Sequence, residues 1–275
     1  MPLRQGLTWI ATIAFLAACT PVNGSADVQV TLEATPVIIE PTITEDATAV
    51  IQAPTSTVVP GQAISTDPTP TAEDSFEICS PLGMHPLEEL PQIISDPYKP
   101  PPPNKPEERH HGVDFGYWHY GERDTMLGEP VQAILGGVVA SVLNDKYPYG
   151  NMILIETSRS ELPYAIVRLL DIPPGDSLFH LYAHLDQPPD YALGDIVQAC
   201  QPIGEVGESG NTDIPHLHLE TRLGPAGKQF ESMFFYNTRA TIEEMENYVL
   251  WRTSGVFRHF DPMALLTYPT ITQPD

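Results

Sequence analysis

Positively charged residues are scarce in this sequence. The chain has 275 residues, of which 13 are lysine or arginine and 36 are aspartate or glutamate, so its formal net charge at pH 7 is -23. No lysine or arginine occurs between Arg4 and Lys99. Because proteins that bind nucleic acids need a basic surface against the phosphates, this composition argues against a nucleic-acid partner.

The sequence also lacks an apolar run long enough to cross a membrane. The stretch Leu7–Ala18 follows Arg4 but is shorter than the roughly 20 residues that a spanning helix needs. It ends in Leu16-Ala17-Ala18-Cys19, which resembles the signal of bacterial lipoproteins. We therefore expect residues 1–18 to be a signal peptide and a lipid on Cys19 to anchor the protein to the cell membrane on its extracytoplasmic side. Ordinary secretion is the alternative.

Aromatic residues are absent from positions 20 to 74. This segment is rich in threonine, proline and acidic residues, and its prolines interrupt both helices and sheets. We expect residues 19–75 to be a disordered tether, which would reach about 150 Å in the polyproline II limit. A lead-in segment, 76–109, and a folded domain, 110–268, follow.

Cysteine is rare as well. Apart from Cys19, the chain has only Cys79 and Cys200. In an exported protein these two could form a disulfide, which the chain-entropy model values at roughly 4–5 kcal/mol. Two separate buried thiols are the other option, and the sequence does not decide between them.

Short alternating or β-branched runs, separated by turn residues, fill the C-terminal part of the chain. They predict strands over residues 130–133, 138–143, 152–156, 179–185 and 216–222. In Thr241–Trp251, acidic and apolar residues are interleaved at helical spacing. The pattern predicts an all-β dominated fold of antiparallel β-sheets, with a C-terminal insertion that carries one short helix beginning near Thr241.

Three short segments contain histidines together with other side chains that could act with them in a metal or catalytic site. They are His110-His111-Gly112-Val113-Asp114, Leu181-Tyr182-Ala183-His184-Leu185 and Pro215-His216-Leu217-His218-Leu219-Glu220. Strand side chains alternate, so His216 and His218 project from one face, where burial is costly unless they bind something such as a divalent metal. Catalytic zinc takes three histidine or carboxylate ligands and keeps one position for water.

The residues alone do not decide which of these histidines would bind the metal. A step of four residues returns His110 and Asp114 to one face, but spacing does not exclude His111, nor does it choose between His216 and His218. His180 shares strand parity with His184, so we expect it to be a neighbour of the site. We expect Glu220 to support a ligand rather than to bind the metal itself.

The stretch from about His110 to Arg222 resembles the lysostaphin-type zinc metallopeptidases, bacterial enzymes that cut peptide bonds in peptidoglycan. The family's motifs match His110-x-Gly112-x-Asp114, Tyr182-x-His184 and His216-x-His218, and the intervening stretches 128–139, 149–151 and 194–210 match in order. The resemblance implies a barrel-sandwich hybrid fold. It also implies that His110, Asp114 and His218 bind Zn²⁺, and that His184 and His216 act beside the metal as general base or transition-state stabilisers.

The implied function is zinc-dependent hydrolysis of peptide bonds in cell-wall peptidoglycan, by a metal-activated water assisted by two histidines. Two alternatives stay open: a non-catalytic peptidoglycan-binding or hydrolase-activating module of the same fold, and a peptidase that acts on exported proteins. The chain departs from the family pattern by two insertions, 158–176 and 224–258. Because loops around a site set its specificity, these insertions leave the shape of the substrate cleft undetermined.

Overall fold

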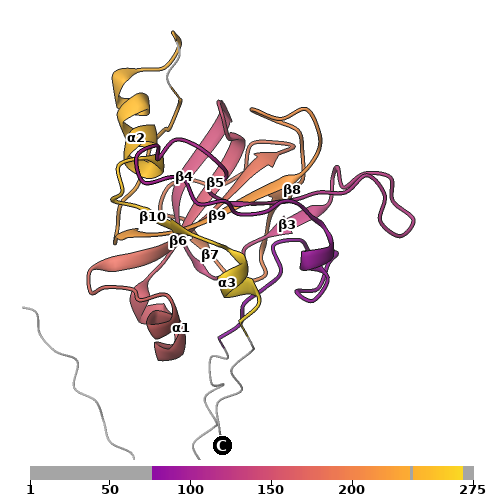
Figure 1. Ribbon diagram of the computed structural model, residues 1–275, viewed down its shortest axis with the longest axis horizontal. Helices are drawn as coiled ribbons and strands as arrows, with labels where there is room; N and C mark the ends of the chain where they lie inside the picture. Colours follow the sequence, from indigo (N-terminus) through magenta and orange to yellow (C-terminus); the bar gives the residue numbers. More distant parts are fainter. Residues whose placement is uncertain (1–75, 236–237, 269–275) are drawn as a thin grey trace, which may run out of the picture. The chain divides into compact units, whose positions relative to one another are not determined.

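The computed structural model describes residues 76–235 and 238–268 (Figure 1). The signal peptide, Cys19 and the tether that we expect over residues 1–75 lie outside the described residues. Within the described ranges, no helix combines the length and the apolar character that a membrane crossing requires.

Antiparallel strands dominate the fold, as the sequence predicts. One sheet has eight strands, in the order β1-β2-β9-β6-β5-β4-β7, with β10 also paired to β9, and a second sheet joins β3 and β8. The strands are β1 (Ile94–Asp96), β2 (Val113–Phe115), β3 (Pro130–Gln132), β4 (Gly137–Lys146), β5 (Gly150–Thr157), β6 (Asp176–Leu185), β7 (Ile196–Val197), β8 (Pro202–Glu205), β9 (Leu217–Pro225) and β10 (Arg258–Phe260). The five predicted strands correspond to β3, β4, β5, β6 and β9.

The predicted helix in the second insertion is α2 (Ile242–Arg252). It begins after Thr241, whose Oγ1 accepts a hydrogen bond from the backbone N–H of Glu244 at 3.2 Å, while the Glu244 carboxylate accepts from the N–H of Thr241 at 2.8 Å. The other helical segments are the 3-10 turns η1 (Leu90–Gln92) and η2 (Arg159–Glu161) and the short helices α1 (Tyr164–Leu169) and α3 (Met263–Leu266). The helix α1, in the first insertion, was not predicted.

Alternation along β9 separates its apolar side chains from its polar ones. Leu217 and Leu219 belong to the larger of two hydrophobic cores. His218 and Glu220, at the intervening positions, therefore lie on the opposite face of the large sheet. This face carries the chemistry discussed below.

The second insertion covers part of that same polar face. Trp251 of α2 is fully buried and packs edge-on against Phe179 of β6, with ring centroids 6.3 Å apart, and Phe257 contacts both rings. These residues belong to a second, smaller core. Residues 224–258 are therefore an integral part of the folded domain and bring α2 close to the polar end of β9.

A disulfide joins Cys79 in the lead-in segment to Cys200 in the loop between β7 and β8, with their Cα atoms 5.3 Å apart. Of the two options that the sequence left open, the structure has the bonded one. The bridge connects residues 121 positions apart, which makes the closed loop long.

Replacing both cysteines by serine is expected to lower the free energy of unfolding by about 4–5 kcal/mol, because the cross-link restricts the unfolded chain. The measurement is urea unfolding of the Cys79→Ser/Cys200→Ser protein beside the oxidised parent. Reducing agent should shift the midpoint of the parent and leave the double variant unchanged. Equal midpoints for the oxidised parent and the variant would contradict this expectation.

Candidate metal centre

Strand pairing brings the first and third histidine segments together. Asp114 of β2 lies directly opposite His218 of β9, and His110 immediately precedes β2 in the chain. The His110 Nε2 lies 3.0 Å from the Asp114 Oδ1 and 3.0 Å from the His218 Nδ1. The latter nitrogen lies 2.7 Å from the same carboxylate oxygen. Three possible ligand atoms thus converge on one point.

The outer nitrogen of each ring in this cluster faces an acceptor. The His110 Nδ1 lies 3.0 Å from the carbonyl oxygen of Pro97, and the His218 Nε2 lies 3.1 Å from the Glu220 carboxylate. Because a carbonyl or carboxylate oxygen accepts only from an N–H, these contacts favour a proton on the outer nitrogen. In the neutral rings, the inner nitrogens then carry lone pairs that can bind a metal.

This set of donors fits zinc. Zinc binds imidazole nitrogen and carboxylate oxygen at about 2.0–2.2 Å, so ligand atoms of one tetrahedral site lie roughly 3.3 Å apart. Two of the distances here, both 3.0 Å, are close to that spacing, and the third, 2.7 Å between the His218 Nδ1 and the Asp114 Oδ1, is shorter than it. In the described residues, the other cluster of this kind is Glu77, Cys79 and Cys200, whose sulfurs are consumed by the disulfide.

The electrostatics also favour a cation at this point. Burial lowers the pKa of His218, but hydrogen bonds to Asp114 and Glu220 outweigh it and raise this pKa to about 9. Burial likewise opposes ionisation of Asp114, yet hydrogen bonds from His110 and His218 hold its pKa well below the usual value. Carboxylates that stabilise a proton on the His218 ring also stabilise a metal ion bound to it.

His184 reaches the same cleft because the end of β6 is irregular. The pairing of β5 with β6 shifts register between Tyr182 and Leu185, and His184 has a positive φ of 62°. Tyr182 and Leu185 both point into the larger core. The extra residue between them therefore turns His184 to the opposite, polar face, as β-bulges commonly do near functional sites.

This bulge corrects one expectation from the sequence. His180 and His184 do not share a face, because strand parity holds only as far as Tyr182. His180 is fully buried, with its ring nitrogens 3.0 Å from the Thr157 hydroxyl and 2.8 Å from the Tyr182 hydroxyl. Burial lowers its pKa to about 3, so His180 is a neutral part of the core.

The carbonyl group of Ser209 orients the His184 ring, accepting a hydrogen bond from Nδ1 at 2.7 Å. This carbonyl is placed by two glycines in close contact: a Cβ on Gly210 would lie 2.4 Å from the backbone nitrogen of Gly150. Both glycines have positive φ. The sequence stretches Tyr149-Gly150 and Ser209-Gly210 are therefore needed to hold His184.

His216 completes the group. Its Nδ1 lies 3.0 Å from the carbonyl oxygen of Ile214, which directs Nε2 toward the carboxylate of Asp114, 3.5 Å away. The centroids of the His216 and His184 rings are 4.6 Å apart. Burial and the neighbouring His218 and His216 lower the pKa of His184 to about 3, so its ring is neutral. The structure thus brings together all five site residues named from the sequence.

His111 lies apart from this cluster. It is fully buried and stacks on His259 with ring centroids 4.5 Å apart, and its Nδ1 accepts a hydrogen bond from Arg222 at 3.1 Å. Burial, then the charge of Arg252, lowers its pKa to about 3. The structure therefore places His110, and not its neighbour, beside Asp114.

A buried network around Glu220 supports His218. The Glu220 carboxylate is fully buried and accepts hydrogen bonds from the Tyr149 hydroxyl at 3.0 Å and from the Nε and Nη2 of Arg222 at 2.8 and 2.7 Å. Arg222 also donates to the backbone carbonyl of Trp251 at 2.7 Å. Sequence reasoning missed Arg222, although its place two residues after Glu220 puts both side chains on one strand face.

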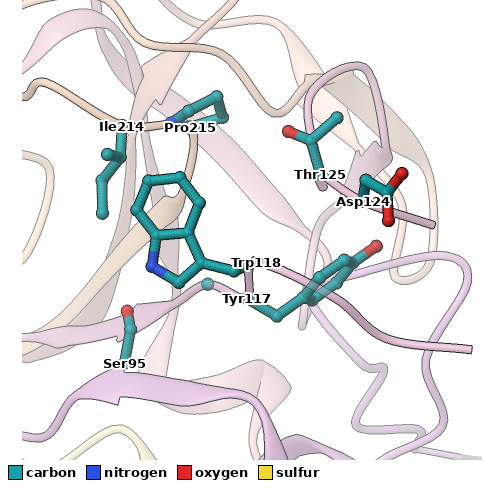
Figure 2. A pocket seen from close by; sticks show the side chains of 8 residues that line it. Ser95, Tyr117, Trp118, Asp124, Thr125, Ile214 and Pro215 are labelled. Carbon is teal, nitrogen blue, oxygen red and sulfur yellow. The ribbon is translucent and has the colours of Figure 1, made fainter.

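A cleft of about 610 Å³ lies over the cluster. One wall comes from the strand ends and the other from the second insertion, through Phe235, Met245, Tyr248, Val249, Arg252 and Thr253. A separate hollow of about 80 Å³ lies beyond His216, where Figure 2 shows the Trp118 indole beside Ile214 and Pro215. Trp118 is 75% exposed, so it lines a surface rather than the core.

Residues 108–231 match the model of Peptidase family M23. Among solved structures, the catalytic domain of the antimicrobial peptidase lysostaphin from Staphylococcus simulans is 22% identical, with 67% of this chain and 99% of that one covered and a TM-score of 0.38. A mutant catalytic domain of the prophage-encoded M23 protein EnpA from Enterococcus faecalis is 23% identical, with 50% and 85% covered and a TM-score of 0.35. A zinc containing peptidase from Vibrio cholerae is 25% identical, with 47% and 33% covered and a TM-score of 0.32. No curated protein matches the chain.

Proposed function

Since this chain carries a domain of peptidase family M23, matched over residues 108–231, we propose that the protein is a zinc-dependent endopeptidase that hydrolyses peptide bonds in bacterial cell-wall peptidoglycan. The observation that supports this best is the convergence of His110, Asp114 and His218 on one point with His184 and His216 beside them. These residues come from three distant segments, and each ring turns its outer nitrogen to an acceptor.

His110, Asp114 and His218 would hold the ion, which supplies Lewis acidity that polarises a peptide carbonyl and makes water a better nucleophile. His184 has its Nδ1–H engaged by Ser209, so its Nε2 is free to accept a proton during attack. His216 is fixed in the same way by Ile214. His216 would transfer a proton to the leaving amine or, once protonated, stabilise the negative charge that develops on the oxygen of the peptide carbonyl.

The alternative of a non-catalytic binding module is less consistent with this geometry. A module that only binds a wall peptide needs neither three converging metal donors nor two further oriented imidazoles. Glu220, buried and held by Arg222, stabilises the orientation of His218 in the way that supporting carboxylates do in catalytic zinc sites. The arrangement favours turnover.

Export and membrane attachment belong to the same proposal. The Cys79–Cys200 disulfide fits a protein that folds in an oxidising compartment outside the cytoplasm. Together with the lipoprotein-like signal that ends at Cys19, it supports an extracytoplasmic enzyme anchored by a lipid. Its substrates would then be the wall peptides within reach of the tether.

The test is digestion of purified peptidoglycan by the chain without its signal peptide, loaded with one equivalent of zinc. We expect soluble fragments with new amino groups, detected by mass spectrometry, and loss of this release after chelation with recovery on adding zinc. Binding to the wall without new amino groups would identify a binding module instead. Cleavage of an unfolded exported protein, with peptidoglycan left intact, would identify the other alternative.

A further inference from the structure

The second insertion places one permanent cation in the cleft. Arg252, the last residue of α2, is the only lysine or arginine among the described residues that line it. Its side chain is 17% exposed, so the guanidinium is largely desolvated but still reachable from the cleft. Apart from Thr253, the rest of this wall is apolar or aromatic, including Phe235 and Val249.

The polar contacts of Arg252 within the protein are loose. Its Nη1 lies 3.4 Å from the Glu220 carboxylate and its Nη2 lies 3.5 Å from the carbonyl oxygen of Arg109. Both distances exceed the usual range of about 2.7–3.2 Å for an N–H···O hydrogen bond. Its other polar neighbours are two tyrosine hydroxyls: that of Tyr149, which hydrogen-bonds with Arg252 and itself donates to Glu220, and that of Tyr248. A guanidinium with five N–H donors is therefore not saturated here.

The charge of Arg252 is also poorly balanced. The one carboxylate paired with it in the described residues is Glu220. Arg222 already binds that carboxylate through two bonds of 2.8 and 2.7 Å. Two guanidinium groups thus share one carboxylate, and the tighter contacts belong to Arg222. Arg252 contributes a net positive charge to the cleft wall.

Arg252 lies close to the reacting centre. Glu220, which it contacts at 3.4 Å, also accepts from the His218 ring at 3.1 Å. An anion bound by Arg252 would therefore sit beside a peptide bond placed over His110, Asp114 and His218. Because this chain carries a net charge of -23, such an anion would find little other attraction on the protein.

Taking the proposed peptidase function as given, we infer that Arg252 is a substrate-binding residue that selects peptides with a free carboxylate near the bond to be cut. Arginine suits this role because its planar fork binds a carboxylate through two parallel hydrogen bonds, which are strong in a partly desolvated site. The carboxylate can come from the C-terminus of the peptide or from an acidic side chain. Both sources present the same chemistry to Arg252.

The experiment compares synthetic wall stem peptides in three forms: with all carboxylates free, with only the side-chain carboxylates amidated, and with only the C-terminus amidated. Binding to the zinc-loaded protein is measured by calorimetry, and cleavage is measured separately as kcat and KM. We expect amidation at the recognised position to weaken binding about tenfold or more and to raise KM, with kcat little changed. The amidated peptide whose binding is weakened identifies the source of the carboxylate.

Arg252→Gln should remove this preference, so that free and amidated peptides bind alike, at the level of the amidated peptide on the parent protein. Arg252→Lys keeps the charge without the fork and should retain part of the preference. Arg258→Gln, which removes an exposed arginine of the same insertion outside the cleft, should behave as the parent. Thermal melting of each variant checks that the domain is folded.

Two results would overturn the inference: a parent protein that binds free and amidated peptides equally, or an Arg252→Gln protein that loses affinity for all forms to the same extent. The second would mean that Arg252 only supports Glu220. If the carboxylate preference appears in binding but no peptide or wall is cleaved, the inference stands and the proposed peptidase function fails.

Discussion

Asp114→Ala is expected to abolish both zinc binding and peptide release, with activity falling by about a thousandfold or more. Asp114 is the one carboxylate in the cluster, and its Oδ1 lies 3.0 Å from the His110 Nε2 and 2.7 Å from the His218 Nδ1. Without it, the imidazole rings of His110 and His218 alone remain to hold a divalent ion. Zinc content of the purified protein, measured by mass spectrometry beside wall digestion, checks both parts.

The matched control for this variant is Asp190→Ala, which removes an exposed aspartate outside the cleft. It should keep one zinc per chain and full activity. Because Asp114 is partly buried among imidazole rings, thermal melting must accompany the assay, and zinc should raise the melting temperature of the control but not of Asp114→Ala. An Asp114→Ala protein that keeps its zinc and its activity would show that Asp114 does not belong to the metal site.

His184→Ala is expected to separate metal binding from chemistry. Zinc content and wall binding should stay at the parental level, because no His184 ring atom belongs to the three-donor cluster. The rate constant kcat should fall about 10²–10⁴-fold, the usual contribution of a positioned general base. His119→Ala, which removes an exposed histidine elsewhere, is the control and should leave kcat unchanged.

The double variant His184→Ala/His216→Ala provides the sharper comparison. The two rings lie side by side, so their losses should be less than additive if they serve one proton-transfer step. Wall digestion at the parental rate by this double variant would refute the roles proposed for both histidines. Loss of zinc from it would instead place one of them among the ligands.

Much of this site could be predicted because it depends on strand periodicity. The alternation in Pro215–Glu220 puts His216, His218 and Glu220 on one face, and the pairing of β2 with β9 then needs only the correct register to bring Asp114 opposite His218. The strands themselves are short β-branched runs between turn residues. The fold class and the helix that follows Thr241 were accessible for the same local reasons.

Other features could not be predicted because they depend on long-range geometry. The bulge that turns His184 to the polar face arises from the pairing of β6 with β5. The alternation of side chains along β6 alone does not reveal such an irregularity. The burial of His111 beside Arg222 follows from how the second insertion folds back onto the sheet. The same folding places Arg252 in the cleft, and no spacing rule in the sequence connects it with His218, 34 positions away by their residue numbers.

The position of the disulfide has a mechanical consequence. Cys79 lies three residues after Phe76, where the described part of the chain begins, so a pull through the preceding segment meets the cross-link almost at once. Tension would then pass to Cys200, in the loop between β7 and β8, and would not unzip β1 and β2 from the sheet edge. A pull on the N-terminal end of the domain would therefore load Cys79 and Cys200 before it reached the edge strand β1.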